Sequence, residues 1–154
     1  MDRESASACL DRPDPYWQIE HMTVAGIPEG ARVLRQRIMA FLSASPLSLD
    51  ELSSIELAVG EACTNALKHG SPGHERDEIR AKCMRNHETL IVEITDNGSG
   101  FDPQLVVPPK PEELRESGMG IMLMRRLMDS VEFEFGRGTT VRLVKHYRAG
   151  LTDL

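Results

Sequence analysis

The chain has 154 residues, a net charge of −6 and 40% apolar residues, enough to bury one hydrophobic core. The acidic balance disfavours a nucleic-acid-binding protein, because such proteins hold phosphates largely through basic side chains. No apolar run approaches the ~20 residues that cross a bilayer, and the polar first residues do not resemble a signal peptide. The three cysteines have no Cys-x-x-Cys spacing, which disfavours a disulfide framework and a structural zinc site. We therefore expect a cytoplasmic protein that contacts neither membrane nor nucleic acid.

Residues 1–15 are predicted to be a flexible leader, residues 16–148 a single domain and residues 149–154 a tail. A strand is expected first, from Tyr16 to Ile27, with Trp17, Ile19 and Val24 as core candidates. A helix then begins at Pro28, since proline favours the first helical turn, and it ends before Pro46. Its inward residues recur at helical spacing: Ala31, Leu34, Ile38 and Phe41.

Ser48 and Glu51 form a capping box, which predicts a second helix that runs to Gly70. Its core stripe is Leu52, Ile55, Val59, Ala62 and Ala66. The remaining expected elements are strands Asp77–Arg85 and Thr89–Thr95, a helix Gly118–Asp129, and a hairpin of Val131–Phe135 with Thr140–Tyr147. This order predicts an α/β (α+β) two-layer sandwich, with a mostly antiparallel mixed sheet and helices on one face.

Glu61 and Asn65 lie four residues apart in the second helix, so they share one face. Such a pair can simply be a solvated polar face. The neighbouring alanines, however, would let a bulky ligand approach. Mg²⁺ prefers oxygen ligands and keeps several waters, so one amide oxygen plus substrate phosphates is sufficient. The carboxylate could then accept a proton from an attacking hydroxyl.

Two glycine-containing motifs follow. Asp96-Asn97-Gly98-Ser99-Gly100 closes a strand and is either a β-turn or a site where a carboxylate accepts the amino group of adenine. Gly118-Met119-Gly120 opens an apolar helix and is either a flexible helix entry or a phosphate site formed by free N–H groups. The proline-rich stretch Phe101–Ser117 between them is long enough to be a lid or disordered.

Together these motifs resemble the GHKL or Bergerat-type ATP-binding fold, and most closely the anti-sigma-factor serine/threonine kinases of bacterial partner-switching systems. The stretches that carry the resemblance are Ala58–Ala66, Ser117–Gly120, Leu127–Asp129 and Gly138-Thr139-Thr140-Val141. The similarity spans roughly Ile27 to His146.

The resemblance implies a role for each site residue. Asn65 matches the magnesium ligand and Glu61 the general base. Asp96 matches the adenine-binding carboxylate, and Thr139 matches the threonine that supports the adenine site, often through water. The other implied nucleotide contacts are Gly98, Gly100, Gly118, Met119, Gly120 and, reaching toward the phosphates, Lys68, with Asp102–Ser117 as the ATP lid.

The resemblance also implies a function. Such kinases use ATP and Mg²⁺ to phosphorylate a serine or threonine of an anti-anti-sigma (STAS-domain) protein, bind a sigma factor in competition with it, and form homodimers. Close relatives can carry a basic residue before the Ser-Gly-x-Gly of the lid, where this chain has Glu116 after Arg115. A nucleotide-gated binding module with little kinase activity and a non-sigma partner is therefore an alternative. A stand-alone histidine-kinase ATPase module is another, although it needs a phosphoacceptor hairpin for which no room is expected before Tyr16.

Overall fold

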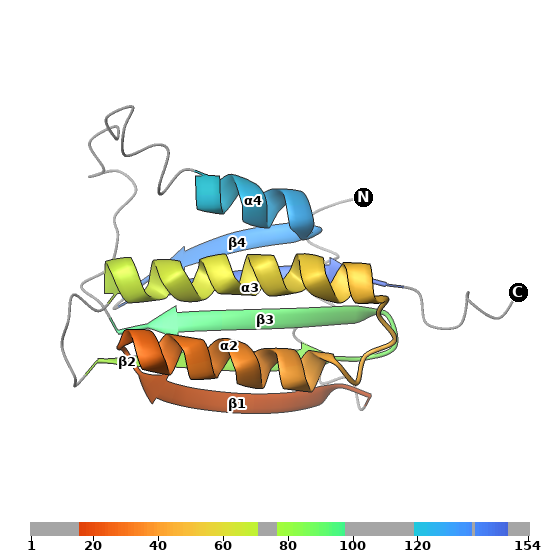
Figure 1. Cartoon of the computed structure of the whole chain (residues 1–154), viewed down its shortest axis with the longest axis horizontal. Coiled ribbons are helices and arrows are strands. Elements are labelled where there is room, and N and C mark those ends of the chain that lie inside the picture. The colour runs from red at the N-terminus through yellow and green to blue at the C-terminus, as the bar shows by residue number, and fades with distance from the viewer. Residues whose placement is uncertain (1–15, 71–76, 98–118, 137, 148–154) are drawn as a thin grey trace, which may run out of the picture.

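A computed structural model of the chain describes residues 16–70, 77–97, 119–136 and 138–147. Its elements are β1 (Gln18–Ala25), α2 (Pro28–Leu42), α3 (Leu49–Gly70), β2 (Glu78–Arg85), β3 (Thr89–Asp96), α4 (Met119–Leu127), β4 (Ser130–Phe135) and β5 (Thr139–His146). The strands form one sheet in the order β1-β2-β3-β5-β4, with the helices in a layer over it (Figure 1). The predicted two-layer fold is confirmed. All four pairings in this part of the chain are antiparallel, so the sheet here is antiparallel rather than mixed.

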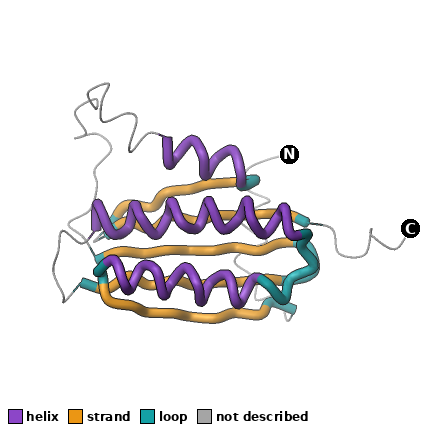
Figure 2. The backbone as a smooth tube through the Cα atoms, in the orientation of Figure 1, coloured by secondary structure: helices purple, strands orange, loops and turns teal. Residues whose placement is uncertain are grey.

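Helices α2 and α3 run side by side across the sheet (Figure 2), and sequence signals fix their starts. Pro28 occupies the first turn of α2, and the helix ends at Leu42, where the N–H of Ser43 donates to the carbonyl of Met39. The capping box of α3 is formed as predicted. The N–H of Glu51 donates to Ser48 Oγ at 3.1 Å, and the N–H of Ser48 donates to Glu51 Oε1 at 3.3 Å.

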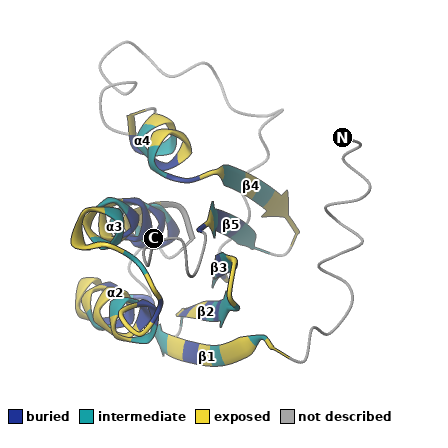
Figure 3. Ribbon diagram, turned by 90° about the vertical axis from the view of Figure 1, so that its right-hand side faces the viewer, coloured by how far each residue is buried: buried dark blue, intermediate teal, exposed yellow. Residues whose placement is uncertain are grey.

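The hydrophobic core fills the space between the sheet and the helices, whose inner faces are buried (Figure 3). The helices contribute the predicted stripes, including Leu34 and Ile55, both fully buried. Each such side chain stabilises the fold by about 1.5–3 kcal/mol relative to an exposed one. Among the residues that the structure describes, no helix is both long enough and apolar enough to span a bilayer.

Of the three core candidates predicted in and before β1, only Val24 packs against the core in the described part of the chain, and Trp17 is half-buried outside it. Ile19, expected in the core, is 51% exposed, whereas Met22 is 2% exposed and joins the core. Side chains alternate between the two faces of a strand, so Ile19 and Val24 cannot both face the helices. Val24 packs against the core, and Ile19 therefore points to the helix-free face.

Candidate active site

Glu61 and Asn65 lie on the side of α3 that faces α4, and both are half-buried. The helix places them there because its other side is anchored in the core by the fully buried alanines Ala58 and Ala62. Neither side chain has a hydrogen bond or an ion pair with another residue of the described segments. A carboxylate and a carboxamide one turn apart are thus available to a ligand.

The first turn of α4 closes onto this pair. Gly120 is buried, and a Cβ placed on it would stand 2.7 Å from Glu61 Oε2 and 4.0 Å from Asn65 Oδ1. Two motifs that are far apart in the sequence therefore meet, with the N–H groups of a helix start beside a carboxylate and an amide. The free N–H groups of a first helical turn attract anions such as phosphates.

A second cluster forms where β3 ends beside the start of β5. Asp96 is only 5% exposed, and the backbone N–H of Thr139 donates to its Oδ1 at 3.3 Å. A Cβ on Gly138 would stand 1.8 Å from the Asp96 carbonyl oxygen, so only glycine permits this approach. Asp96 and Thr139, each predicted from the sequence as a site residue, are therefore in contact.

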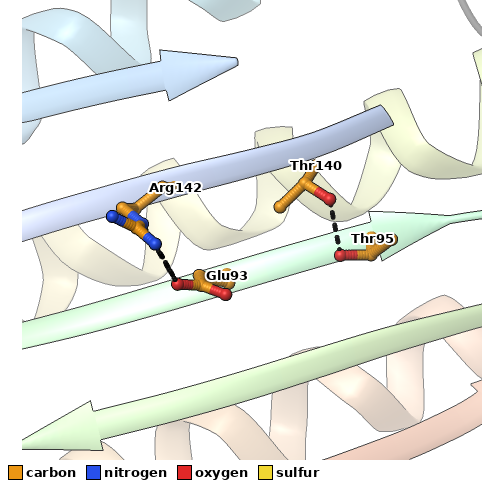
Figure 4. Close-up of polar contacts among 4 residues, drawn as sticks. All are labelled: Glu93, Thr95, Thr140 and Arg142. Carbon is orange, nitrogen blue, oxygen red and sulfur yellow. Dashed lines mark hydrogen bonds and ion pairs between the residues drawn. The ribbon is translucent and has the colours of Figure 1, made fainter. Parts of the chain in front are cut away.

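Two side-chain pairs on the helix-free face hold β3 and β5 in this register (Figure 4). Arg142 donates to Glu93 Oε1 through Nη2 at 2.7 Å and through Nε at 3.0 Å. The hydroxyls of Thr95 and Thr140 hydrogen-bond at 2.8 Å. The Thr95–Thr140 pair directly adjoins Asp96 and Thr139 in the sequence, so it supports the position of the buried carboxylate.

The two clusters lie at the same end of the molecule. In Figure 1 the C-terminal end of α3, the tip of β3 and the start of α4 all lie on the left. The end of β3 and the start of α4, which are consecutive elements along the chain, thus lie at the same end of the two-layer fold as the C-terminal end of α3.

The side chains at this site suit a magnesium ion that is bound together with a nucleotide better than a metal ion that is held by protein ligands alone. No group of three His, Cys, Asp or Glu side chains within the described segments could hold a metal ion. Mg²⁺ needs few protein ligands when phosphates and water complete its octahedron. The amide oxygen of Asn65, which has no hydrogen-bond partner among the described residues and lies next to a helix start, suits that kind of binding.

Other predicted site residues are exposed or lie outside the described segments. Met119 is 62% exposed, and Lys68 is exposed, without a hydrogen bond or ion pair to any residue with described coordinates. The loop glycines Gly98, Gly100 and Gly118 and the expected lid, Asp102–Ser117 with Arg115 and Glu116, lie outside the described residues. Their roles stay predictions.

Cys63, inside the α3 motif, is not a candidate nucleophile. Burial raises the pKa of its thiol to about 12, although the charge of Arg35 opposes the shift. Burial also raises the pKa of the Cys83 thiol to about 12, helped by the charges of Glu20 and Cys63. Reactive cysteines need a lowered pKa, so both thiols are inert core residues.

Sequence reasoning missed two features of this region. The sequence motif included Gly138 but assigned it no role, whereas the structure shows that it lets β5 approach the backbone of Asp96. The only available signal was its position directly before Thr139. Arg35 and Leu57 line a groove that reaches Glu61. Single exposed residues on separate helices carry no pattern, so no sequence signal could have paired them.

A helix-covered sheet with a Glu and an Asn one turn apart, beside the glycine start of another helix, is the arrangement of an ATP-binding domain of the histidine kinase type. The chain belongs to the family described as the histidine kinase-like ATPase domain, whose sequence profile matches residues 25–145.

Two curated relatives align with most of this chain. Serine-protein kinase RsbW of Bacillus subtilis is 30% identical over 86% of this chain and 88% of its own. The anti-sigma F factor of Clostridium botulinum is 34% identical over 73% of this chain and 83% of its own. A crystal structure of the RsbU and RsbW domains of a Mycobacterium tuberculosis protein shares the fold, with a TM-score of 0.59 at 18% identity. It covers 86% of this chain, which spans 34% of that longer chain.

Proposed function

We propose that this protein uses Mg-ATP to phosphorylate a serine or threonine of an anti-anti-sigma STAS-domain protein, and that it binds a sigma factor in competition with that protein. The observation that carries the proposal is the contact of Glu61 with the glycine start of α4, one turn from Asn65. The chain's 30% identity to a serine-protein kinase and 34% identity to an anti-sigma factor supports the same assignment.

Each half of the site has its part in nucleotide binding. Asp96, buried and aligned by Thr139, accepts the amino group of adenine. The N–H groups at the start of α4 bind the phosphates, which gives an acidic protein a way to hold a polyanion. Asn65 and the phosphates would hold Mg²⁺, which supplies neutralisation of negative charge during transfer.

The transfer itself needs a proton acceptor and an in-line hydroxyl. A bond forms between the acceptor oxygen and the γ-phosphorus while the bond from that phosphorus to the bridging oxygen breaks, so that ADP leaves. Glu61 takes the hydroxyl proton. Its carboxylate has no competing partner among the described residues, as this role demands.

The kinase activity is tested by incubating the protein with ATP, Mg²⁺ and a purified STAS-domain protein from the same genome. Mass spectrometry should find one phosphorylated serine or threonine on the STAS protein. Glu61→Ala should remove transfer and preserve ATP binding, whereas unchanged turnover would reject Glu61 as the base. Nucleotide-dependent binding without transfer would favour the binding module over the kinase.

The sigma-factor and dimer parts of the proposal have separate tests. A purified sigma factor from the same genome should bind the protein and be displaced by the unphosphorylated STAS protein. Failure of either step would remove the anti-sigma role and leave the kinase. Light scattering of the purified protein measures whether it is the homodimer implied by the resemblance.

A further inference from the structure

A row of apolar side chains crosses the helix-free face of the sheet. The strand register places Ile19 of β1, Met84 of β2, Ile91 of β3 and Val144 of β5 side by side. Ile91 lies between two residues of the helix-side core, and Val144 pairs with it. Because side chains alternate along a strand, both point to the helix-free face. We call these four residues the apolar row.

The middle of the apolar row is buried, although the three described helices all lie on the opposite face of the sheet (Figure 3). Ile91 is 0% exposed and Val144 is 9% exposed, whereas Ile19, at the β1 end of the row, is 51% exposed. The free face of an antiparallel sheet is normally solvated, so these values indicate a cover over β3 and β5. Within the described residues, no helix or strand supplies that cover.

The first and last described residues differ in the face of the sheet that they occupy. Tyr147, the last described residue, is 7% exposed and packs in the helix-side core. Trp17 is half-buried and does not belong to that core. It lies two residues before Ile19, so alternation puts both on the helix-free face. The chain therefore enters the domain on the side of the apolar row and leaves it on the side of the helices.

Tyr16 marks the point from which residues 1–15 extend. The centroid of its ring lies 5.8 Å from that of His87, in the turn between β2 and β3. Ile91 follows His87 by four residues, which is about 13 Å of extended strand. A proline-rich segment spans about 3.1 Å per residue, so the stretch from Tyr16 back to Leu10 covers about 19 Å. Leu10 can therefore reach Ile91.

The sequence before Tyr16 suits such a cover. Residues 6–10 read Ala-Ser-Ala-Cys-Leu, so Ala6, Ala8 and Leu10 share one side of an extended segment. The two alanines are small enough to let the backbone approach the large side chains of the apolar row. Two prolines between this segment and Tyr16 restrict the free chain, which lowers the entropy lost when the segment is held.

The charges on the two sides are also complementary. Residues 1–15 carry four acidic side chains and two arginines. Lys82 lies on the helix-free face in register with Glu93, and it has no hydrogen bond or ion pair within the part of the chain that the structure describes. Exposed ion pairs contribute little, so apolar contact rather than charge would hold the segment in place.

We propose that residues 1–15 form a strap that folds back over the helix-free face, with residues 6–10 packed on Ile91 and Val144. The strap covers apolar side chains that would otherwise be open to a second copy of the chain or to another protein. It also lies against β3 and β5, whose register supports the candidate active site. A strap of this kind forms whether or not the protein is a kinase, and it differs from the flexible leader that the sequence predicts.

The first test attaches a spin label to Cys9 in the full-length protein. Cys63 and Cys83 are buried and their thiols have a pKa of about 12, so a methanethiosulfonate nitroxide should modify Cys9 alone. In an extended segment Cys9 lies on the side opposite Leu10, so the label leaves the apolar contact intact. Mass spectrometry verifies that one label is present.

Methyl NMR of the labelled protein locates residues 1–15. The paramagnetic relaxation rates of the Ile91 and Val144 methyls should be several-fold larger than those of Leu34 and Ile55, which lie in the helix-side core. Equal rates at the four residues would overturn the strap. Nitroxide-labelled protein mixed with isotope-labelled protein without nitroxide should show no broadening. Broadening of Ile91 in this mixture would place a second copy on the face and would also overturn the proposal.

The second test uses Trp17, the only tryptophan of the chain, as a fluorescent reporter. Leu10→Asp puts a charge against the apolar row, which is unfavourable, and should release the strap. The emission maximum should then shift to longer wavelength, and acrylamide should quench the fluorescence more strongly. Leu151→Asp makes the same change after the last described residue and should leave both readings unchanged. An unchanged spectrum in Leu10→Asp, or an equal shift in Leu151→Asp, would refute the assignment of residues 1–15 as the cover.

Discussion

The start of α4 lies so close to Glu61 of α3 that any side chain at residue 120 would collide with its carboxylate: a Cβ there would stand 2.7 Å from Glu61 Oε2. Contacts this short do not persist, so any larger residue would push the carboxylate away. Since the obstructing atom is the far end of a flexible side chain, Glu61 can move without unfolding the helix. The position of the carboxylate, rather than the stability of the fold, is therefore what Gly120 protects.

Gly120→Ala should lower the rate of phosphoryl transfer by roughly 10- to 100-fold, because a displacement of about 1 Å at a catalytic group has an effect of that size. The free energy of unfolding should change by less than about 1 kcal/mol, since alanine favours the helix and offsets the crowding. Single-turnover kinetics and urea denaturation measure the two quantities. Gly136→Ala, with nothing within 4 Å of its Cβ, is the matched control. A full transfer rate in Gly120→Ala would show that Glu61 tolerates the shift.

Asn65→Ala should remove the dependence of ATP affinity on magnesium. The amide oxygen is the proposed protein ligand of the ion, and its loss should weaken Mg-ATP binding by about 1.5–3 kcal/mol, the range for contacts to charged groups. Calorimetry with Mg²⁺ and with excess EDTA separates the metal contribution. Gln36→Ala removes an exposed amide from α2 and should change neither titration. An Asn65→Ala protein that still gains affinity from Mg²⁺ would exclude Asn65 as the ligand.

Local sequence signals predicted most of the fold because each has a local physical cause. The Ser48–Glu51 capping box set the start of α3, and Pro28 set the start of α2, within a residue of the observed ends. The i, i+4 spacing put Glu61 and Asn65 on one face. The family resemblance named Asp96 and Thr139 as separate site residues, and the hydrogen bond between them came from the structure.

The features that were not predicted depend on how helices and strands pack against one another, and local sequence patterns do not determine that packing. Ile19 was expected in the core because it is apolar, yet the burial of Met22 fixes the opposite face of β1 inward. The contact of Gly120 with Glu61 and the groove of Arg35 and Leu57 each join two helices. No periodicity within one helix encodes the position of another.

Gly138→Ala should lower both stability and nucleotide affinity. Its Cβ would stand 1.8 Å from the backbone oxygen of Asp96 and 3.3 Å from Oδ1 of the same residue, and a backbone atom cannot turn aside. We expect a loss of about 1–3 kcal/mol or more in the free energy of unfolding, as for overpacked cores. The Asp96 carboxylate, which we propose binds adenine, would move with its backbone, so ATP affinity should fall more than the unfolded fraction explains.

Gly30→Ala separates these two effects. Its Cβ would stand 1.9 Å from the backbone oxygen of Ala25, a similar clash between α2 and β1 without any predicted nucleotide contact. Thermal unfolding should show a comparable loss of stability, while calorimetry of the folded protein should show unchanged ATP affinity. Equal losses of ATP affinity in both variants would mean that Gly138 acts on stability alone.

The buried thiols of Cys63 and Cys83 should make the protein less stable in alkali. Burial raises the pKa of each from 9.0 to about 12, so between these values the unfolded chain releases protons that the folded chain keeps. The folded state binds more protons there, and the free energy of unfolding therefore falls as pH rises above 9. The stabilisation is complete below pH 9, and the loss should reach roughly 1.4 kcal/mol per thiol at pH 10.

Urea denaturation at pH 8, 9 and 10 measures this loss against a Cys63→Ala/Cys83→Ala variant. The variant should be less stable at pH 8, because it loses buried volume, but its stability should fall more slowly with pH. Other alkaline groups titrate equally in both proteins, so the difference between the curves isolates the thiols. Parallel curves would contradict the raised pKa values, as would rapid alkylation of Cys63 or Cys83 by iodoacetamide in the native protein at pH 8, since the thiolate is the reactive form.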